Sequence, residues 1–448
     1  PAYWYASFKA DYQRLIQRFG ERYNNDSRVA FIEISTGVDG ENQPVHPNSG
    51  NLLEACLQTA GLSQYGWEMY MKDVTNYYLS AFPNKALMLQ HYPTFVHDME
   101  RRTIADHAGP LGVGFAGNGL KPDIDKASRR DDPNNNFYKA FLDDPAVSYS
   151  TTVPIAFEAY RDYYLTDYIL QYWGILSALN LRADYIVALD HLFKDWEMPR
   201  WESLRFANRY LGKDASNTPE IWVALRESGY TYYPHKGNYS FFLRQDDNVS
   251  GGRTKVVTYR PVCTLPDQNA CPEYQIRQAT GIIGGVTMLN NTKEGWITRR
   301  TDQASGNPYM WFKADDAFIN GGTNPISITV TYFDQGTDTW SLEYDGPGGA
   351  QTTAGIVTKG NTNTWRKHLF FSENARMANG LTGGSDFRIN SRGDGDEYIH
   401  MVMMARRSGP PQLGVGLKAG ANLISLPLAP GSTAIGDVLS SIAGQYSK

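Results

Sequence analysis

Residues 29–41 read VAFIEISTGVDGE, an apolar run that a turn-rich stretch ending in Glu41 follows directly. The run is short enough for a buried strand, and comparable runs recur along the first half of the chain, at 86–90, 111–115, 153–157 and 184–189. Helical patterns separate these runs, at 8–19, 67–81, 165–179, 201–210 and 219–228. Alternating strands and helices predict a parallel α/β architecture.

Five strand patterns leave two parallel architectures open. A (β/α)₈ TIM-type barrel has eight strands, so it would require three further βα units before Pro1. A doubly wound open sheet requires no missing units and remains the alternative.

The pattern changes at Tyr230. Short alternating runs, such as 326–333, 339–344 and 398–403, are separated by Gly, Asn and Asp turns, which predicts an antiparallel β-sandwich. A proline-containing stretch at 408–412 is typical of a linker. We therefore expect three domains: 1–229 as the α/β part, 230–407 as the sandwich, and 408–448 as a linker and the start of a further small domain.

The composition narrows the classes of function. Among 448 residues, 41% are hydrophobic and 20% charged, which excludes global disorder. Lys and Arg total 42 against 47 Asp and Glu, and this net charge of −5 argues against a nucleic-acid partner. No apolar run is long enough to span a membrane. Aromatic residues make up 13%, which fits either sugar-stacking platforms or an aromatic-rich core.

The cysteines predict an oxidising compartment. Cys263 and Cys271 lie close together in a loop-like stretch, which suits a local disulfide, whereas Cys56 is expected to be a buried thiol. The chain begins at Pro1 and ends just after the start of a new strand and helix, so we expect a segment of a longer protein or a processed secreted form. The predicted location is extracellular or at the cell surface.

Two glutamates stand where a parallel sheet would present them together. Glu41 lies just beyond the 29–34 run, and Glu158 comes directly after the 153–157 run. The carboxyl ends of parallel strands share one edge, and a glycosidase needs two carboxyl groups there. Each glutamate alone is equally suited to capping a helix or holding a Lys or Arg side chain.

Other polar and aromatic residues follow the predicted strands. Asn118 and Asp123 are candidates for hydrogen bonds to sugar hydroxyls, although Asn-Gly also forms turns. His91, Tyr92 and Trp196 are candidates to line the same site, with structural packing as the alternative. No cofactor is required. Acidic loops of the sandwich could hold a structural Ca²⁺ or be solvated turns, namely Asp315, Asp316, Asp334 and Asp394 to Asp396.

Residues 22–41 (RYNNDSRVAFIEISTGVDGE) resemble the fourth-strand region of the retaining (β/α)₈ glycoside hydrolases of the β-galactosidase-like clan. Residues 153–158 resemble that clan's seventh strand, which carries the nucleophile, and 184–189 its eighth. The resemblance implies strands four to eight of a TIM-type barrel, with Glu41 as general acid/base and Glu158 as nucleophile. Gly40 departs from the clan's pattern, which has Asn before the acid/base. Residues 331–340, 387–389 and 398–402 resemble β-sandwich modules of bacterial surface proteins.

The sequence therefore predicts an extracellular glycoside hydrolase that acts on a polysaccharide or oligosaccharide with retention of configuration. A partial barrel would expose strand edges, so we expect a covering partner, either a missing N-terminal segment or another copy of the chain. The alternative function is a catalytically inactive surface-layer or filament protein that uses the same domains for assembly or glycan binding.

Overall fold

The computed structural model describes residues 3–45, 61–90, 99–120, 152–159, 168–188, 198–225, 238–246 and 298–407, together with short strands between 248 and 294. By its internal contacts the chain divides into two units, Pro1–Ser408 and Gly409–Lys448. The elements below all belong to the first unit.

The N-terminal half contains one sheet of five parallel strands in sequential order, β1-β2-β3-β4-β5. The strands are β1 (Phe31–Ile34), β2 (Ala86–Gln90), β3 (Gly114–Asn118), β4 (Ile155–Glu158) and β5 (Tyr185–Val187). The predicted (β/α)₈ barrel is wrong: within the described ranges the sheet is an open half-barrel, because five strands cannot complete a ring that needs eight.

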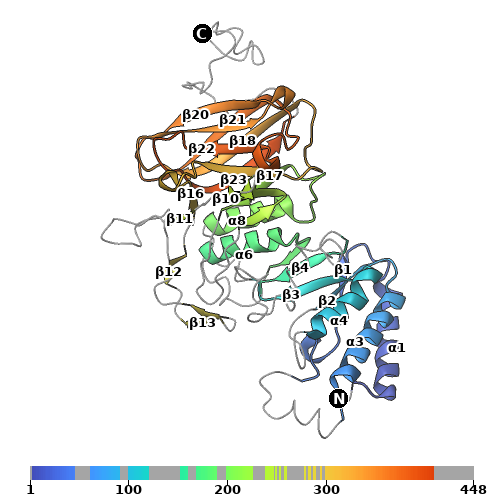
Figure 1. Cartoon of the computed structure of the whole chain (residues 1–448). Helices are drawn as coiled ribbons and strands as arrows, with labels where there is room; N and C mark the ends of the chain where they lie inside the picture. The colour runs from blue at the N-terminus through green and yellow to red at the C-terminus, as the bar shows by residue number, and fades with distance from the viewer. Residues whose placement is uncertain are drawn as a thin grey trace, which may run out of the picture. The chain divides into compact units, whose positions relative to one another are not determined.

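Three helices cover one face of this sheet, α1 (Ala6–Tyr23), α3 (Gln64–Ala81) and α4 (Met99–Ala108) (Figure 1). Alternate strand residues, including Ile34, Leu89 and Phe157, share a buried core with Trp67 on α3. Helix α1 comes very close to the end of α3, because a Cβ on Gly20 would lie 2.3 Å from the Ala81 carbonyl oxygen. Glycine is therefore required at this helix contact.

Helices α6 (Tyr168–Asn180) and α8 (Met198–Tyr210) pack against a strand that the sequence pattern missed. The expected helix over 219–228 is wrong, since Glu220–Ala224 form strand β6, which pairs with β23 (Tyr398–Arg406) and with β7 (Tyr239–Phe241). Trp222 on β6 is fully buried against Trp173 of α6 and Tyr210 of α8 in one core cluster. A short apolar run of this kind fits a buried strand as well as a helix, and its partner strand lies far along the chain.

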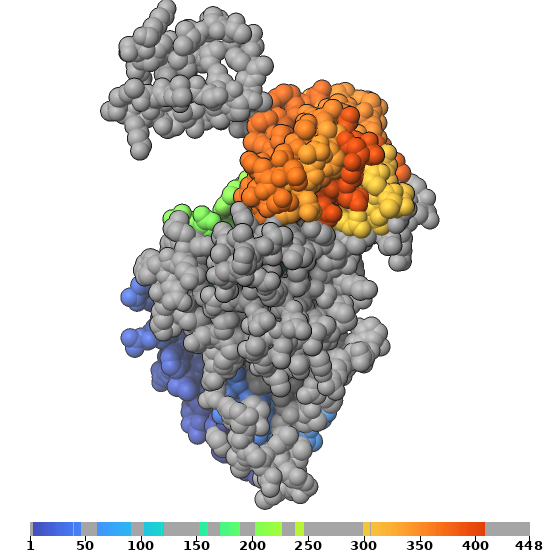
Figure 2. Space-filling model, turned by 90° about the vertical axis from the view of Figure 1, so that its left-hand side faces the viewer, coloured from blue at the N-terminus to red at the C-terminus, as the bar shows by residue number. Residues whose placement is uncertain are grey.

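The described part of the C-terminal half contains two large antiparallel sheets and three short antiparallel pairs. The larger has the order β11-β16-β23-β18-β21, with β6 and β7 attached to β23, and the smaller has the order β20-β19-β22-β17-β8. Residues from both sheets, among them Val330, Trp340 and Ile389, are buried in one core. Figure 2 shows the part of the chain coloured from yellow to red as one continuous body.

The remaining elements complete the chain order. The larger sheet has β11 (Val257–Tyr259), β16 (Thr298–Arg300), β18 (Asn324–Phe333) and β21 (Trp365–Ala375); the smaller has β8 (Leu243–Asp246), β17 (Tyr309–Ala314), β19 (Thr339–Asp345), β20 (Gln351–Thr358) and β22 (Phe387–Asn390). Three short pairs are β9 (Asn248–Val249) with β10 (Gly252–Arg253), β12 (Arg277–Gln278) with β15 (Lys293–Glu294), and β13 (Gly281–Ile283) with β14 (Val286–Met288). Single 3₁₀ turns are η1 (Val38–Gly40), η3 (Gly109–Leu111), η7 (Gln303–Ser305), η8 (Pro347–Gly349) and η9 (Thr382–Gly384).

Candidate functional site

Two carboxyl groups lie on the face of the parallel sheet opposite helices α1, α3 and α4. Glu33 on β1 pairs in register with Met88, and Glu158 ends β4 two residues after Ala156. Met88 and Ala156 belong to the cluster on that face, so alternation along the strands places both glutamates there as well. Glu33 is not among the site residues predicted from the sequence, although a carboxylate inside an otherwise apolar run is itself a signal.

The protein environment changes the proton affinity of both groups. Partial exclusion of water raises the pKa of the Glu158 carboxyl above its ordinary value. The Glu33 side chain reaches solvent, yet shielding by surrounding protein atoms raises its pKa, and the negative charge of Glu158 raises it further. The two carboxyls therefore interact electrostatically, and each keeps its proton to a higher pH than an isolated glutamic acid.

Glu41 follows η1 in a loop that is held against helix α3. The Gln43 side-chain Nε2 donates to Glu41 Oε2 at 2.7 Å, and the Trp67 indole Nε1 donates to the Asn42 carbonyl at 3.2 Å. Gly40 adopts φ +83°, a conformation that favours glycine. The loop folds back on itself, since the Val38 N–H donates to the Gln43 carbonyl oxygen at 2.9 Å, and it holds Glu41 through a neighbouring amide.

The other predicted site residues have mixed outcomes. Asn118 ends β3 and pairs in register with Glu158, so the structure brings these two positions together. The remaining candidates lie outside the described residues and stay predictions: His91, Tyr92, Asp123, Trp196, and the cysteines Cys263 and Cys271.

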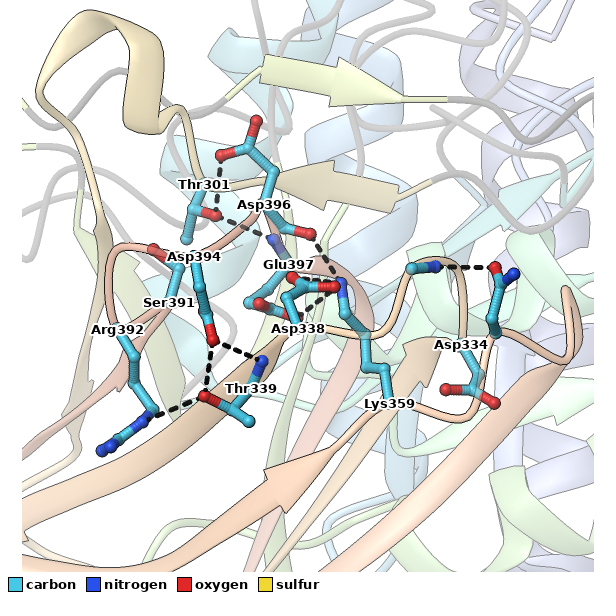
Figure 3. A network of polar contacts seen from close by, with 12 residues as sticks. Thr301, Asp334, Asp338, Thr339, Lys359, Ser391, Arg392, Asp394, Asp396 and Glu397 are labelled. Atoms are coloured by element: carbon cyan, nitrogen blue, oxygen red, sulfur yellow. Dashed lines mark hydrogen bonds and ion pairs between the residues drawn. The ribbon is translucent and has the colours of Figure 1, made fainter.

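The acidic turns of the antiparallel sheets bind protein donors. The Asp334 carboxylate accepts from the Gly360 N–H at 2.8 Å and from Thr362 Oγ1 at 2.6 Å, which holds the loop after β20. Asp394 accepts from the backbone and the hydroxyl of Thr339 (Figure 3). Asp315 and Asp316 accept from the Ala317 N–H and from Asn379 Nδ2, and Asp396 forms an ion pair with Arg300. In the described part of the chain, no three His, Cys, Asp or Glu side chains gather to hold a metal ion.

A buried ammonium lies beside these turns. The Lys359 side chain is 1% exposed, and its Nζ lies 2.8 Å from Asp338 Oδ2, 3.3 Å from Glu397 Oε2 and 3.0 Å from the Asp396 carbonyl oxygen (Figure 3). Burial raises the pKa of Glu397 to about 9, although the Lys359 charge opposes that rise. Because Asp338 precedes β19 and Glu397 precedes β23, this cluster ties the two antiparallel sheets together.

Comparisons with known proteins return partial likenesses. No family model and no curated protein matches the chain. Among solved structures, the isomalto-dextranase of Arthrobacter globiformis T6 complexed with panose aligns over 89% of this chain and 72% of its own, at 11% identity and TM-score 0.27. A xylan-binding domain of carbohydrate-binding module family 22 aligns over 29% of this chain and 83% of its own, at 14% identity and TM-score 0.17. The CBM1 module of BiXyn10A aligns over 24% of this chain and 79% of its own, at 14% identity and TM-score 0.15.

These neighbours are carbohydrate-binding modules and a glycoside hydrolase, at TM-scores too low to carry a functional argument. Among the helices that the structure describes, none is long and apolar enough to cross a membrane.

Proposed function

We propose that this chain is an extracellular carbohydrate-active protein that hydrolyses a glycosidic bond with retention of configuration, with Glu158 as the nucleophile. The observation that carries the proposal is the placement of Glu33 and Glu158 on the same face of the parallel sheet, where they interact electrostatically. The Gln and Asn positions that end β2 and β3, Gln90 and Asn118, belong to the same edge. Two carboxyl groups on one sheet face are the minimum that this reaction needs.

The reaction assigns a different task to each carboxyl. The Glu158 carboxylate attacks the anomeric carbon while a carboxylic acid protonates the leaving glycosidic oxygen, which forms a glycosyl ester on Glu158. The second group, now a carboxylate, then takes a proton from water, and the water cleaves the ester. Glu41, from the family resemblance, and Glu33, from the sheet geometry, are both candidates for this second group.

Variants of the three glutamates test the proposal. We would assay the full chain with 4-nitrophenyl glycosides and with polysaccharides, and compare Glu158→Gln, Glu33→Gln and Glu41→Gln. Loss of the nucleophile should lower kcat by about 10³-fold or more, and loss of the acid/base by about 10²–10⁴-fold. Turnover by Glu158→Gln equal to that of the wild type would contradict the assignment.

Rescue by azide separates the roles. In Glu158→Gly, azide can occupy the place of the nucleophile, and the glycosyl azide should have inverted configuration. In the acid/base variant, azide should attack the glycosyl ester and give the retained configuration. If only one of the variants Glu33→Gly and Glu41→Gly gives the glycosyl azide with retained configuration, the glutamate replaced in that variant is the acid/base.

One observation favours a second function, glycan binding or assembly without hydrolysis. The Glu41 carboxylate accepts a hydrogen bond from Gln43, which engages the residue that the family resemblance assigns to proton transfer. Under this alternative the chain binds polysaccharide but releases no reducing ends, and Glu158→Gln leaves that binding unchanged.

A further inference from the structure

The outward face of the smaller antiparallel sheet carries a polar and aromatic cluster that the proposed hydrolysis does not use. Alternate residues of its strands, such as Phe312, Leu342 and Ile389, are fully buried in the core between the sheets. Their neighbours along the strands therefore face outward. We call four of these outward residues the Arg388 cluster: Tyr309 and Trp311 on β17, Glu343 on β19 and Arg388 on β22.

Glu343 accepts hydrogen bonds from donors on the two strands beside it, β20 and β22. Its carboxylate accepts from Arg388 Nε at 2.6 Å, from Asn390 Nδ2 at 2.8 Å and from Gln351 Nε2 at 2.9 Å. The residue is only 6% exposed, which is low for an acidic side chain on an outward sheet face. With its hydrogen bonds made within the protein, Glu343 acts as an anchor for Arg388.

Arg388 is held rigidly but keeps donors unused. Its guanidinium carbon lies 3.9 Å from the Tyr309 ring centroid and 4.8 Å from that of Trp311, and its side chain is 11% exposed. Only its Nε donates to the described part of the protein, so the two Nη groups have no acceptor there. Two terminal N–H groups fixed in a plane form the fork that binds a carboxylate through two parallel hydrogen bonds.

The surroundings of the fork indicate which carboxylate fits. Lys313 follows Trp311 on the same outward face and adds a second positive charge. Thr353, paired with Glu343, presents an exposed hydroxyl, and Ile356, paired with Ser341, is an exposed apolar side chain on the same face. Glu343 cancels the charge of Arg388. On the neighbouring β8, Arg244 pairs in register with Lys313 and Asp246 with Trp311. The charges of Arg244 and Asp246 also cancel, so this face carries one net positive charge. A singly charged ligand with hydroxyls and an apolar face matches this set better than a dianionic phosphate.

We propose that this face of the sheet binds a saccharide that carries a carboxylate, a uronic-acid residue, with the Arg388 fork on the carboxylate. Lys313 adds attraction for the same charge, and Thr353 is placed for a sugar hydroxyl. Ile356 and the half-buried Tyr309 offer apolar surface to the sugar's C–H groups. This binding is separate from the proposed hydrolysis, because none of its residues lies on the parallel sheet.

The test measures binding by the full chain to polygalacturonate, with methyl-esterified polygalacturonate, alginate, xylan and dextran alongside, by affinity electrophoresis and calorimetry. We expect binding to the two acidic polymers and little to the neutral ones. Arg388→Lys keeps the charge but removes the fork, so it should weaken binding about 10- to 100-fold. Lys313→Ala should weaken binding about 2- to 5-fold. The exposed Lys367→Ala on β21 is the matched control and should bind as the wild type does.

Three results would overturn the proposal. These are equal binding of free and esterified polygalacturonate by the wild type, absence of binding to both acidic polymers, and wild-type binding by Arg388→Lys. The comparison of free with esterified polymer needs no variant, so it decides even if Arg388→Lys fails to fold. Glu158→Gln should bind polygalacturonate as the wild type does, which separates this outcome from failure of the proposed hydrolysis.

Discussion

The parallel sheet and the antiparallel sheets place their polar side chains in different ways. In the parallel sheet Glu33 and Glu158 lie within strands. The third candidate, Glu41, lies in the loop after β1 and depends on the turn at Gly40 and on Gln43. In the antiparallel sheets the polar groups lie on adjacent strands, where the register itself brings Glu343 opposite Arg388. Strand pairing therefore fixes a site more firmly than a loop does.

The two regions also differ in how deeply their charged lysines are buried. Lys359, beside the antiparallel sheets, is 1% exposed and is surrounded by three oxygens from two segments of the chain. Lys9 on α1 pairs with Asp73 on α3, and its side chain is 28% exposed. Water can replace most of the second interaction and very little of the first.

Replacement of these two lysines gives the largest difference between the regions. Lys359→Met leaves the buried Asp338 carboxylate without its cation, and we expect a loss of about 3–5 kcal/mol in the free energy of unfolding. Lys9→Met should cost about 1 kcal/mol or less, because its partner regains water. Urea unfolding of both variants measures the comparison, and equal losses would show that the Lys359 cluster is no more than a surface ion pair.

The Lys359 cluster also predicts that the free energy of unfolding depends on pH. Burial raises the pKa of Glu397 to about 9, so the unfolded chain releases this proton near its ordinary pKa while the folded chain retains it. The unfolded state then binds fewer protons, and the free energy of unfolding falls as the pH rises from about 5 to about 9.

Glu397→Gln, which cannot titrate, should flatten this part of the stability curve. Urea midpoints at several pH values test the expectation. The raised pKa values of Glu33 and Glu158 act in the same direction on the parallel sheet, so their Gln variants serve as the comparison. A slope that persists in Glu397→Gln would assign the dependence to those glutamates or to other groups.

The sequence pattern correctly predicted strands and helices whose formation depends on residues close together in the chain. The 86–90 run is a strand with those bounds, and the 67–81 pattern lies within α3, because apolar periodicity and turn residues act over a few positions. The position of Glu158 at a strand end was predicted for the same reason.

The features that the sequence analysis missed depend on pairing between distant residues. Strand β6 is a strand because β23, nearly two hundred residues later, supplies its hydrogen bonds. Glu343 and Arg388 are 45 positions apart, and only the register of β19 with β22 brings them together. Barrel closure was mispredicted for a related reason, since a run of parallel strands fits both an open sheet and a ring.

The smallest expected effect concerns a local contact in the parallel-sheet region. The Ser63 hydroxyl accepts a hydrogen bond from the Gly66 N–H at 2.9 Å and caps the first turn of α3. Ser63→Ala should lower the free energy of unfolding by about 0.5–2 kcal/mol. Ser7→Ala in the first turn of α1 is the control, because Ser7 is exposed and makes no such hydrogen bond in the described structure.

Ser7→Ala should be neutral or slightly stabilising, since alanine is the better helix former. Thermal unfolding of both variants separates capping from the mere loss of a hydroxyl. If Ser63→Ala is as harmless as Ser7→Ala, then the packing of Trp67 and Val74 alone positions α3. In that case the stability of the parallel-sheet region, like that of the antiparallel one, depends on contacts between distant residues. The two regions would then differ only in how their loops hold polar side chains.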